Sequence, residues 1–151
     1  MIAILDLKAG SEQATSFLAV LQQHLDSFQD HYGIRTELTI PAGMTEHVFE
    51  PSAGVQLLRV IQEAMTNARK HGRARCVRVV FEREDSQARI MVADDGRGFD
   101  PDQLSTGEGD HLGLAFMRER MAQIGGCLTI QSQPGAGTQV VFQVPIVNNE
   151  Q

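Results

Sequence analysis

Residues 52–71 read SAGVQLLRVIQEAMTNARKH, and residues 76–93 that follow them read CVRVVFEREDSQARIMVA. Wound at 100° per residue, the first segment collects apolar side chains on one side of a helix, namely Leu58, Ile61, Met65 and Ala68. Ser52 is a candidate N-cap for this helix, and Gly72 follows its expected end. The second segment alternates apolar and polar residues, which predicts a hairpin of two strands, residues 76–84 and 88–93.

The same periodicities extend in both directions from this helix and hairpin. Helical spacing of apolar residues predicts two more helices, residues 13–32 and residues 113–124. Alternation predicts a strand at residues 35–40 and a second hairpin built from residues 128–131 and 139–144. Strands and helices do not alternate one for one, so we expect an α+β fold, a two-layer sandwich of a mixed β-sheet and a helix layer.

The composition indicates an ordinary globular domain. The chain has 151 residues, of which 42% are hydrophobic, and its 19 acids against 13 Lys and Arg give a net charge of −6. This balance argues against a nucleic acid as the main partner, because phosphate binding requires a basic surface. No apolar run exceeds five residues, which predicts no membrane contact by this chain. Cys76 and Cys127 are expected to be buried thiols in a reducing cytoplasm.

A mixed polar stripe lies opposite the apolar face of the helix at residues 52–71. It contains Glu63, Asn67, Lys70 and His71. Such a stripe is commonly a solvated face. The combination of a carboxylate, an amide, an ammonium and an imidazole also suits a metal–phosphate group, and Asn is a mediocre helix former.

A second candidate follows the predicted strand that ends at Ala93. The segment DDGRGF, residues 94–99, places Asp94 at the end of an apolar strand and glycines at positions 96 and 98. Glycine allows the backbone to approach a flat ligand closely or to adopt a positive φ. Asp94 could accept a hydrogen bond from a ligand amine there. The alternative is a plain surface turn.

Two further glycine-rich segments complete the set. Gly107, Gly109 and Gly113 precede a predicted helix N-terminus, where free N–H groups can bind phosphate. This segment has neither the Gly-Lys-Ser/Thr of a Walker A loop nor the spacing of a dinucleotide fingerprint. Residues 134–138 read PGAGT, and a hairpin turn accounts for the glycines there.

Together these segments resemble the catalytic ATP-binding domain of bacterial sensor histidine kinases, within the gyrase, chaperone, histidine kinase and mismatch-repair ATPase superfamily. The matching segments, in the family's order and spacing, are its N box at residues 62–71, and three glycine boxes at residues 94–99, 113–120 and 135–138. The form GLAFMRER at residues 113–120 is typical of the nitrate-sensor branch. The resemblance covers residues 14–146 and implies a Bergerat-type ATP-binding fold.

The resemblance implies ATP and Mg²⁺ as cofactors. It implies that Asn67 ligates Mg²⁺ through its side-chain oxygen and that Glu63 lies beside the metal and the γ-phosphate as the catalytic carboxylate. A base role for Glu63 stays open, since a kinase gains nothing by hydrolysing ATP. Lys70 and His71 are implied to contact phosphates, or in the case of His71 the sugar.

The resemblance also assigns the base and the remaining phosphate contacts. Asp94 would accept from the adenine amino group, with Thr138 behind that contact. Gly96 and Gly98 would make room for the base. The backbone at Gly113 and Leu114 would hold phosphates, and residues 101–112 would form a lid over the nucleotide.

The family pattern further implies a division of the chain and a set of partners. Residues 1–12 resemble the end of a dimerisation helix or a linker, residues 13–147 the catalytic domain, and residues 148–151 a disordered tail. No histidine lies in a phosphoacceptor motif, so we expect ATP binding without autophosphorylation of this chain alone. The acceptor histidine is expected on an upstream dimerisation domain of a homodimeric, cytoplasmic or inner-membrane-anchored kinase that signals to a response regulator. The alternative is a nucleotide-gated regulatory module such as an anti-sigma-type serine kinase.

Overall fold

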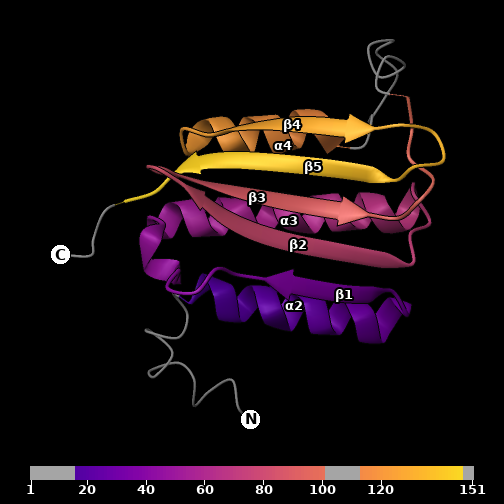
Figure 1. The fold of residues 1–151 in the computed structure, drawn as a ribbon, viewed down its shortest axis with the longest axis horizontal. Helices are drawn as coiled ribbons and strands as arrows, with labels where there is room; N and C mark the ends of the chain where they lie inside the picture. Colours follow the sequence, from indigo (N-terminus) through magenta and orange to yellow (C-terminus); the bar gives the residue numbers. More distant parts are fainter. Residues whose placement is uncertain (1–15, 101–112, 148–151) are drawn as a thin grey trace.

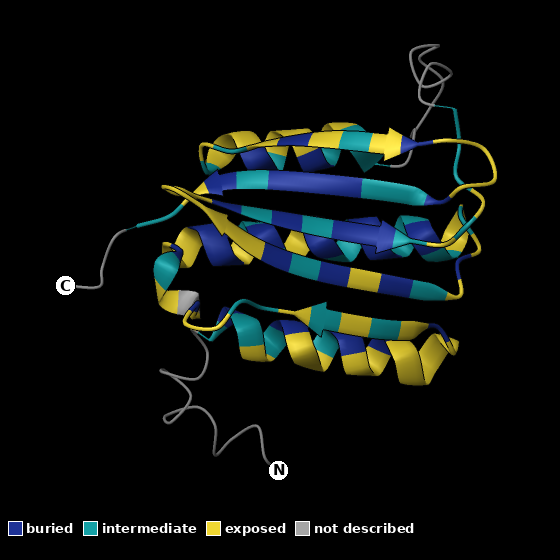
Figure 2. Cartoon of the chain, viewed as in Figure 1, coloured by how far each residue is buried: buried dark blue, intermediate teal, exposed yellow. Residues whose placement is uncertain are grey.

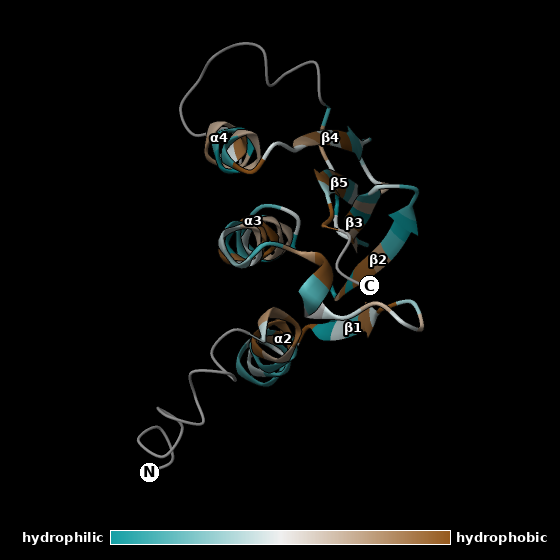
Figure 3. Cartoon of the chain, turned by 90° about the vertical axis from the view of Figure 1, so that its left-hand side faces the viewer, coloured by the Kyte–Doolittle hydropathy of each residue, from teal (hydrophilic) through white to brown (hydrophobic). Residues whose placement is uncertain are grey.

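In the computed structural model, which describes residues 16–100 and 113–147, three α-helices lie side by side on one face of a five-stranded sheet (Figures 1 and 3). The helices are α2 (Phe17–Tyr32), α3 (Pro51–Lys70) and α4 (Leu114–Gln123), with a short 3-10 helix η2 (Glu46–Val48) before α3. The strands are β1 (Arg35–Thr39), β2 (Cys76–Glu84), β3 (Gln87–Asp94), β4 (Cys127–Ser132) and β5 (Thr138–Pro145). This is the α+β, two-layer architecture that the sequence predicts.

The sheet is mixed, with strand order β1-β2-β3-β5-β4. Its two hairpins, β2–β3 and β4–β5, lie where alternation predicts them. Strand β1 pairs with β2 in parallel, and α3 provides the crossover between them. In the central pair, β3 runs antiparallel to β5 with Asp94 opposite Thr138. This register brings two candidate site residues, 44 positions apart in sequence, to the same end of the sheet.

The core lies between the two layers. Alternate residues of β2, β3 and β5 face the helices and are buried, as the dark blue segments of these strands show (Figure 2). Helix α3 covers the centre of the sheet with eight buried residues, which are Ala53, Gly54, Leu57, Val60, Ile61, Ala64, Met65 and Ala68. The predicted stripe is therefore correct except for Leu58, which is only partly buried. None of the described helices is long and apolar enough to span a lipid bilayer.

The ends of the helices follow local rules, with one correction. Ser16 caps α2 by accepting the N–H of Ala19, and residues 13–15 of the predicted helix lie outside the described residues. Helix α3 begins two residues earlier than predicted, because Glu50 and not Ser52 is the N-cap. The reason is Pro51 at the first helical position, where a missing N–H is harmless and the ring fixes a helical φ.

The prediction of two buried thiols is wrong. Both cysteines are free, but Cys76 is half-buried and Cys127 is exposed. Cys127 is the first residue of the edge strand β4. The next residue, Leu128, is buried against the helix layer, so alternation along the strand directs Cys127 to the opposite, exposed face. Apolar neighbours in the sequence did not indicate which face of the strand the thiol occupies.

Candidate functional site

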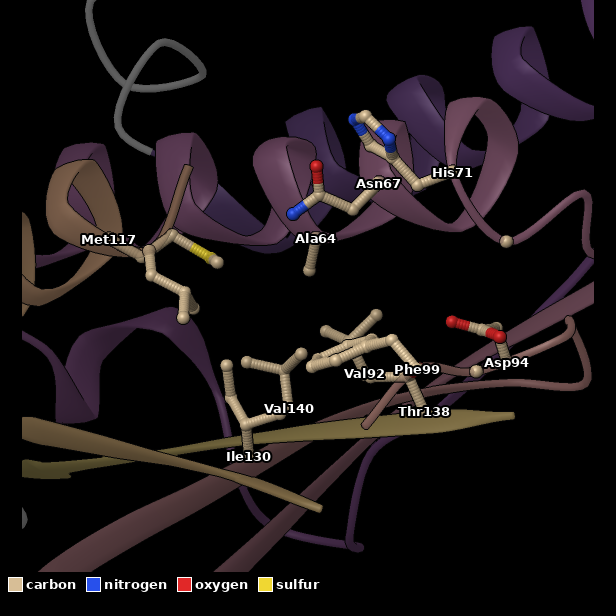
Figure 4. Close-up of a pocket in the computed structure, with 13 residues that line it drawn as sticks. Ala64, Asn67, His71, Val92, Asp94, Phe99, Met117, Ile130, Thr138 and Val140 are labelled. Atoms are coloured by element: carbon tan, nitrogen blue, oxygen red, sulfur yellow. The ribbon is translucent and has the colours of Figure 1, made fainter. Parts of the chain in front are cut away.

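A largely apolar cavity of about 60 Å³ lies between α3 and the sheet, bordered by the start of α4. Figure 4 shows Ala64 and Asn67 of α3 across from the strand residues Val92 and Val140, with Asp94 at one end and Met117 at the other. The complete lining is Ala64, Asn67, His71, Gly72, Val92, Asp94, Gly98, Phe99, Leu114, Met117, Ile130, Thr138 and Val140. An apolar slot with a few polar groups at its ends is typical of a small-molecule site.

Asp94 supplies the carboxylate at one end of the cavity. One of its oxygens, Oδ1, accepts the N–H of Gly96 at 2.7 Å. Burial raises the pKa of Asp94, while the backbone N–H groups of Gly96 and Thr138 act in the opposite direction. The carboxylate is therefore poorly hydrated, and a ligand donor would stabilise its ionised form.

Asp95 has a different environment, although it is the next residue. Its Oδ1 accepts the N–H of Arg75 at 2.8 Å and that of Cys76 at 3.0 Å, so it joins the segment before β2 to the end of β3. Burial opposes ionisation here, but these backbone hydrogen bonds prevail and the pKa of Asp95 is lowered. Asp95 thus braces the loop and does not line the cavity.

The first and last glycine boxes touch backbone to backbone. A Cβ at Gly98 would collide with the carbonyls of Gln133 and Gly137, and a Cβ at Gly137 would collide with the carbonyl of Asp94. Both glycines also have positive φ, at 65° and 78°. Glycine is needed at these positions because two loops cross there without room for a side chain.

Arg97 connects the loops to the end of α3, a role that sequence reasoning missed. Its Nε donates to the carbonyl of His71 at 2.9 Å, and its N–H donates to the carbonyl of Gly72 at 2.8 Å. Its own carbonyl accepts the N–H of Gly135. One residue therefore joins the N box to two of the glycine boxes, through contacts that only the fold creates.

Glu63 belongs to α3, and its carboxylate lies at the N-terminus of α4. A Cβ at Gly113 would collide with the carboxylate of Glu63, so the N box and the second glycine box meet there. Gly113 is the N-cap of α4 with φ 69°, and no side chain caps the helix. Asn67 follows Glu63 by four residues and lies on the same side of α3.

The side-chain oxygens of Glu63 and Asn67 on α3 suit a magnesium ion bound together with phosphate. Mg²⁺ prefers oxygen ligands and usually combines one or two protein groups with substrate phosphates and water. Asn67 and Glu63 offer an amide oxygen and a carboxylate one turn apart, near a helix N-terminus that favours anions. The residues present therefore fit a Mg²⁺–phosphate group.

The structure places the other predicted site residues as follows. His71, Gly98, Leu114 and Thr138 line the cavity together with Asn67 and Asp94. Gly96 contacts Asp94 from outside the lining, and a Cβ there would collide with the carbonyl of Gly72. Lys70 is exposed at the end of α3 and does not line the cavity. The predicted lid, residues 101–112, lies outside the described residues.

Residues 52–148 match the model of a family described as histidine kinase-, DNA gyrase B-, and HSP90-like ATPase. The signal transduction histidine-protein kinase/phosphatase DegS of Brevibacillus brevis is 30% identical over 147 residues, which are 97% of this chain and 37% of that protein. The sensor histidine kinase LiaS of Bacillus subtilis is 34% identical over 86% of this chain and 34% of that protein.

Solved structures share the fold. The ATP-binding domain of PrrB from Mycobacterium tuberculosis superposes with a TM-score of 0.68 at 21% identity, covering 88% of this chain and 96% of that one. ShkA in complex with AMPPNP gives 0.67 at 20% identity, covering 87% of this chain and 30% of that one. The chain spans little more than a third of the length of the curated relatives DegS and LiaS named above.

Proposed function

Because this chain belongs to the family of histidine kinase-, DNA gyrase B- and HSP90-like ATPases and is the ATP-binding catalytic domain of a sensor histidine kinase, we propose that it binds ATP with Mg²⁺ and donates the γ-phosphoryl group to a histidine. That histidine would lie on a dimerisation domain of the same protein. The observation that carries the proposal is the cavity in which residues of the N box and of the three glycine boxes meet.

The adenine would lie in the apolar part of this cavity. Val92 and Val140 of the sheet and Ala64 of α3 offer flat apolar walls, and Asp94 with Thr138 stands at the polar end. The desolvated carboxylate of Asp94 gains a donor when the adenine amino group binds. Gly98 lines this end of the cavity as well.

The phosphates would then reach the other polar groups of α3 and the start of α4. Asn67 would hold the metal, which neutralises phosphate charge when bound. The N–H groups at Gly113 and Leu114 would face phosphate oxygens at a helix N-terminus. His71 would add a contact at the cavity wall, and the exposed Lys70 could extend its ammonium to the phosphates.

Glu63 would act on the reacting centre. Its carboxylate lies against Gly113, where we place the phosphates, so it can orient the incoming imidazole or accept its proton. In the transfer, the bond between the γ-phosphorus and the bridging oxygen of ADP breaks as the nitrogen–phosphorus bond forms. In this proposal the domain is a cytoplasmic part of a homodimeric kinase. A response regulator would then accept the phosphoryl group from the phosphorylated histidine.

Titration calorimetry with and without Mg²⁺ tests the metal site. The chain should bind ATP more tightly with Mg²⁺ present, and Asn67→Ala should remove most of this gain because its oxygen is the proposed metal ligand. Thr66→Ala, one residue away and outside the cavity lining, is the control and should keep the gain. An unchanged Mg²⁺ effect in Asn67→Ala would place the metal elsewhere.

A labelling experiment tests the direction of phosphoryl transfer. With γ-labelled ATP, we expect this chain to stay unlabelled and to label a dimerisation domain of the same protein supplied as a separate polypeptide. The phosphate on that domain should be acid-labile and base-stable, as phosphohistidine is. Glu63→Gln should slow the transfer while leaving ATP affinity near that of the wild type. Stable label on the chain itself would contradict the proposal.

A further inference from the structure

Among the side chains that the structure describes, Ser132, the last residue of β4, is the one buried polar side chain, with 8% of its surface exposed. Its hydroxyl oxygen has three neighbours within hydrogen-bonding distance. The N–H of Phe99 lies at 2.9 Å, the carbonyl of Gly137 at 3.1 Å and the hydroxyl of Thr138 at 2.8 Å. Ser132 thus touches both the first and the last glycine box.

Counting hydrogens fixes the direction of each bond. The N–H of Phe99 can only donate, so Ser132 accepts from it. The carbonyl of Gly137 can only accept, so it takes the single hydroxyl hydrogen of Ser132. The hydroxyl of Thr138 must therefore donate to Ser132, which leaves its oxygen with free lone pairs.

The position of Thr138 gives this direction a consequence. Thr138 pairs with Asp94 across the β3–β5 register, and both residues line the cavity at the same end. The backbone N–H of Thr138 already donates a hydrogen bond to the carboxylate of Asp94. With its hydrogen directed to Ser132, the Thr138 hydroxyl can only accept from the cavity, as the ionised Asp94 does.

We propose that Ser132 is a positioning residue for base recognition, which holds the Thr138 hydroxyl as an acceptor beside Asp94 so that this end of the cavity selects a base with an amino group. The inference rests on the proposed ATP-binding function and adds a residue that does not line the cavity. Without the Ser132 hydroxyl, that of Thr138 is free to rotate and to present its hydrogen to the base.

The test compares ATP with purine riboside triphosphate, which lacks the 6-amino group. Wild type should bind ATP more tightly than the analogue. Ser132→Ala should weaken ATP binding roughly 2- to 10-fold, as expected for one hydrogen bond, and leave the analogue nearly unchanged. Thr138→Val should reduce the preference similarly, and adding Ser132→Ala to it should have no further effect on the preference. Ser132→Thr, which keeps the hydroxyl, should retain the preference.

Two results would overturn the inference. Equal losses for both nucleotides in Ser132→Ala would mean that Ser132 only braces the loops. If Ser132→Ala reduced the preference for ATP by the same factor in the wild type and in the Thr138→Val variant, Ser132 would not act through the Thr138 hydroxyl. If the alanine variant does not fold, Ser132→Cys, of similar size and with much weaker hydrogen bonding, carries the same expectations. Failure of the wild type to bind ATP would instead refute the proposed function itself.

Discussion

Replacing Asp94 with Asn should lower ATP affinity by roughly 10- to 100-fold, the usual effect of losing a hydrogen bond to a charged group. The N–H of Gly96, which donates to Oδ1 of Asp94, would hold the amide oxygen, so the amide NH₂ would face the adenine amino group and two donors would oppose each other. Calorimetry with ATP and GTP measures the effect. The wild type should prefer ATP strongly, because guanine presents a carbonyl to the carboxylate.

Asp95→Asn is the matched control. Its amide oxygen can still accept from Arg75 and Cys76, so this variant should fold and bind ATP almost as the wild type does. Acidification offers a second comparison. Because burial raises the pKa of Asp94, ATP affinity should fall as the pH drops through that raised value, and Asp94→Asn should lack this dependence. Equal losses at positions 94 and 95 would remove Asp94 from base recognition.

Gly137→Ala is expected to have the second large effect, on both stability and binding. The added Cβ would collide with the carbonyl of Asp94, so the end of β3 and the start of β5 must separate. Overpacking of this kind costs roughly 1–3 kcal/mol in the free energy of unfolding, in addition to the strain of the backbone. ATP binding should be lost with it, since Asp94 and Thr138 lie at this junction.

Gly135→Ala measures the cost of a positive φ alone, without a steric collision. Gly135 has φ 83°, close to the 78° of Gly137, but a Cβ there would meet nothing within 4 Å. We expect a loss of about 1–2 kcal/mol from the left-handed conformation and unchanged ATP affinity. Urea unfolding and calorimetry of both variants give the comparison. Similar losses in the two variants would show that the contact with Asp94 is unimportant.

The fold was predictable where it depends on local patterns. Alternation located both hairpins, and helical spacing located α3 and its buried face. The parallel pairing of β1 with β2 and the contact of β3 with β5 join distant segments, and no local pattern encodes them. The N-cap of α3 was misplaced because Ser52 is a good cap by residue type, whereas Pro51 decides where the helix begins.

In the candidate site, too, some residues could be recognised from local sequence patterns and others only from contacts between distant segments. Asn67 stands out in the sequence because Asn is a mediocre helix former within a stripe of mixed polar groups, and Asp94 because it is a carboxylate at the end of an apolar strand. Arg97 and Ser132 resemble ordinary turn and strand residues. Their partners lie up to 38 positions away, so their part in the site is visible only once the loops have crossed.

The position of the cavity between the two layers has a thermodynamic consequence. A nucleotide there would contact α3 on one side and β3 and β5 on the other, and the unfolded chain offers no such site. By mass action, ligand at a hundred times its Kd adds about 2.7 kcal/mol to the free energy of unfolding. A change of this size shifts the population of unfolded chains available to proteases about a hundredfold. The supply of nucleotide would therefore govern how long the domain survives in a cell, independently of any phosphate it transfers.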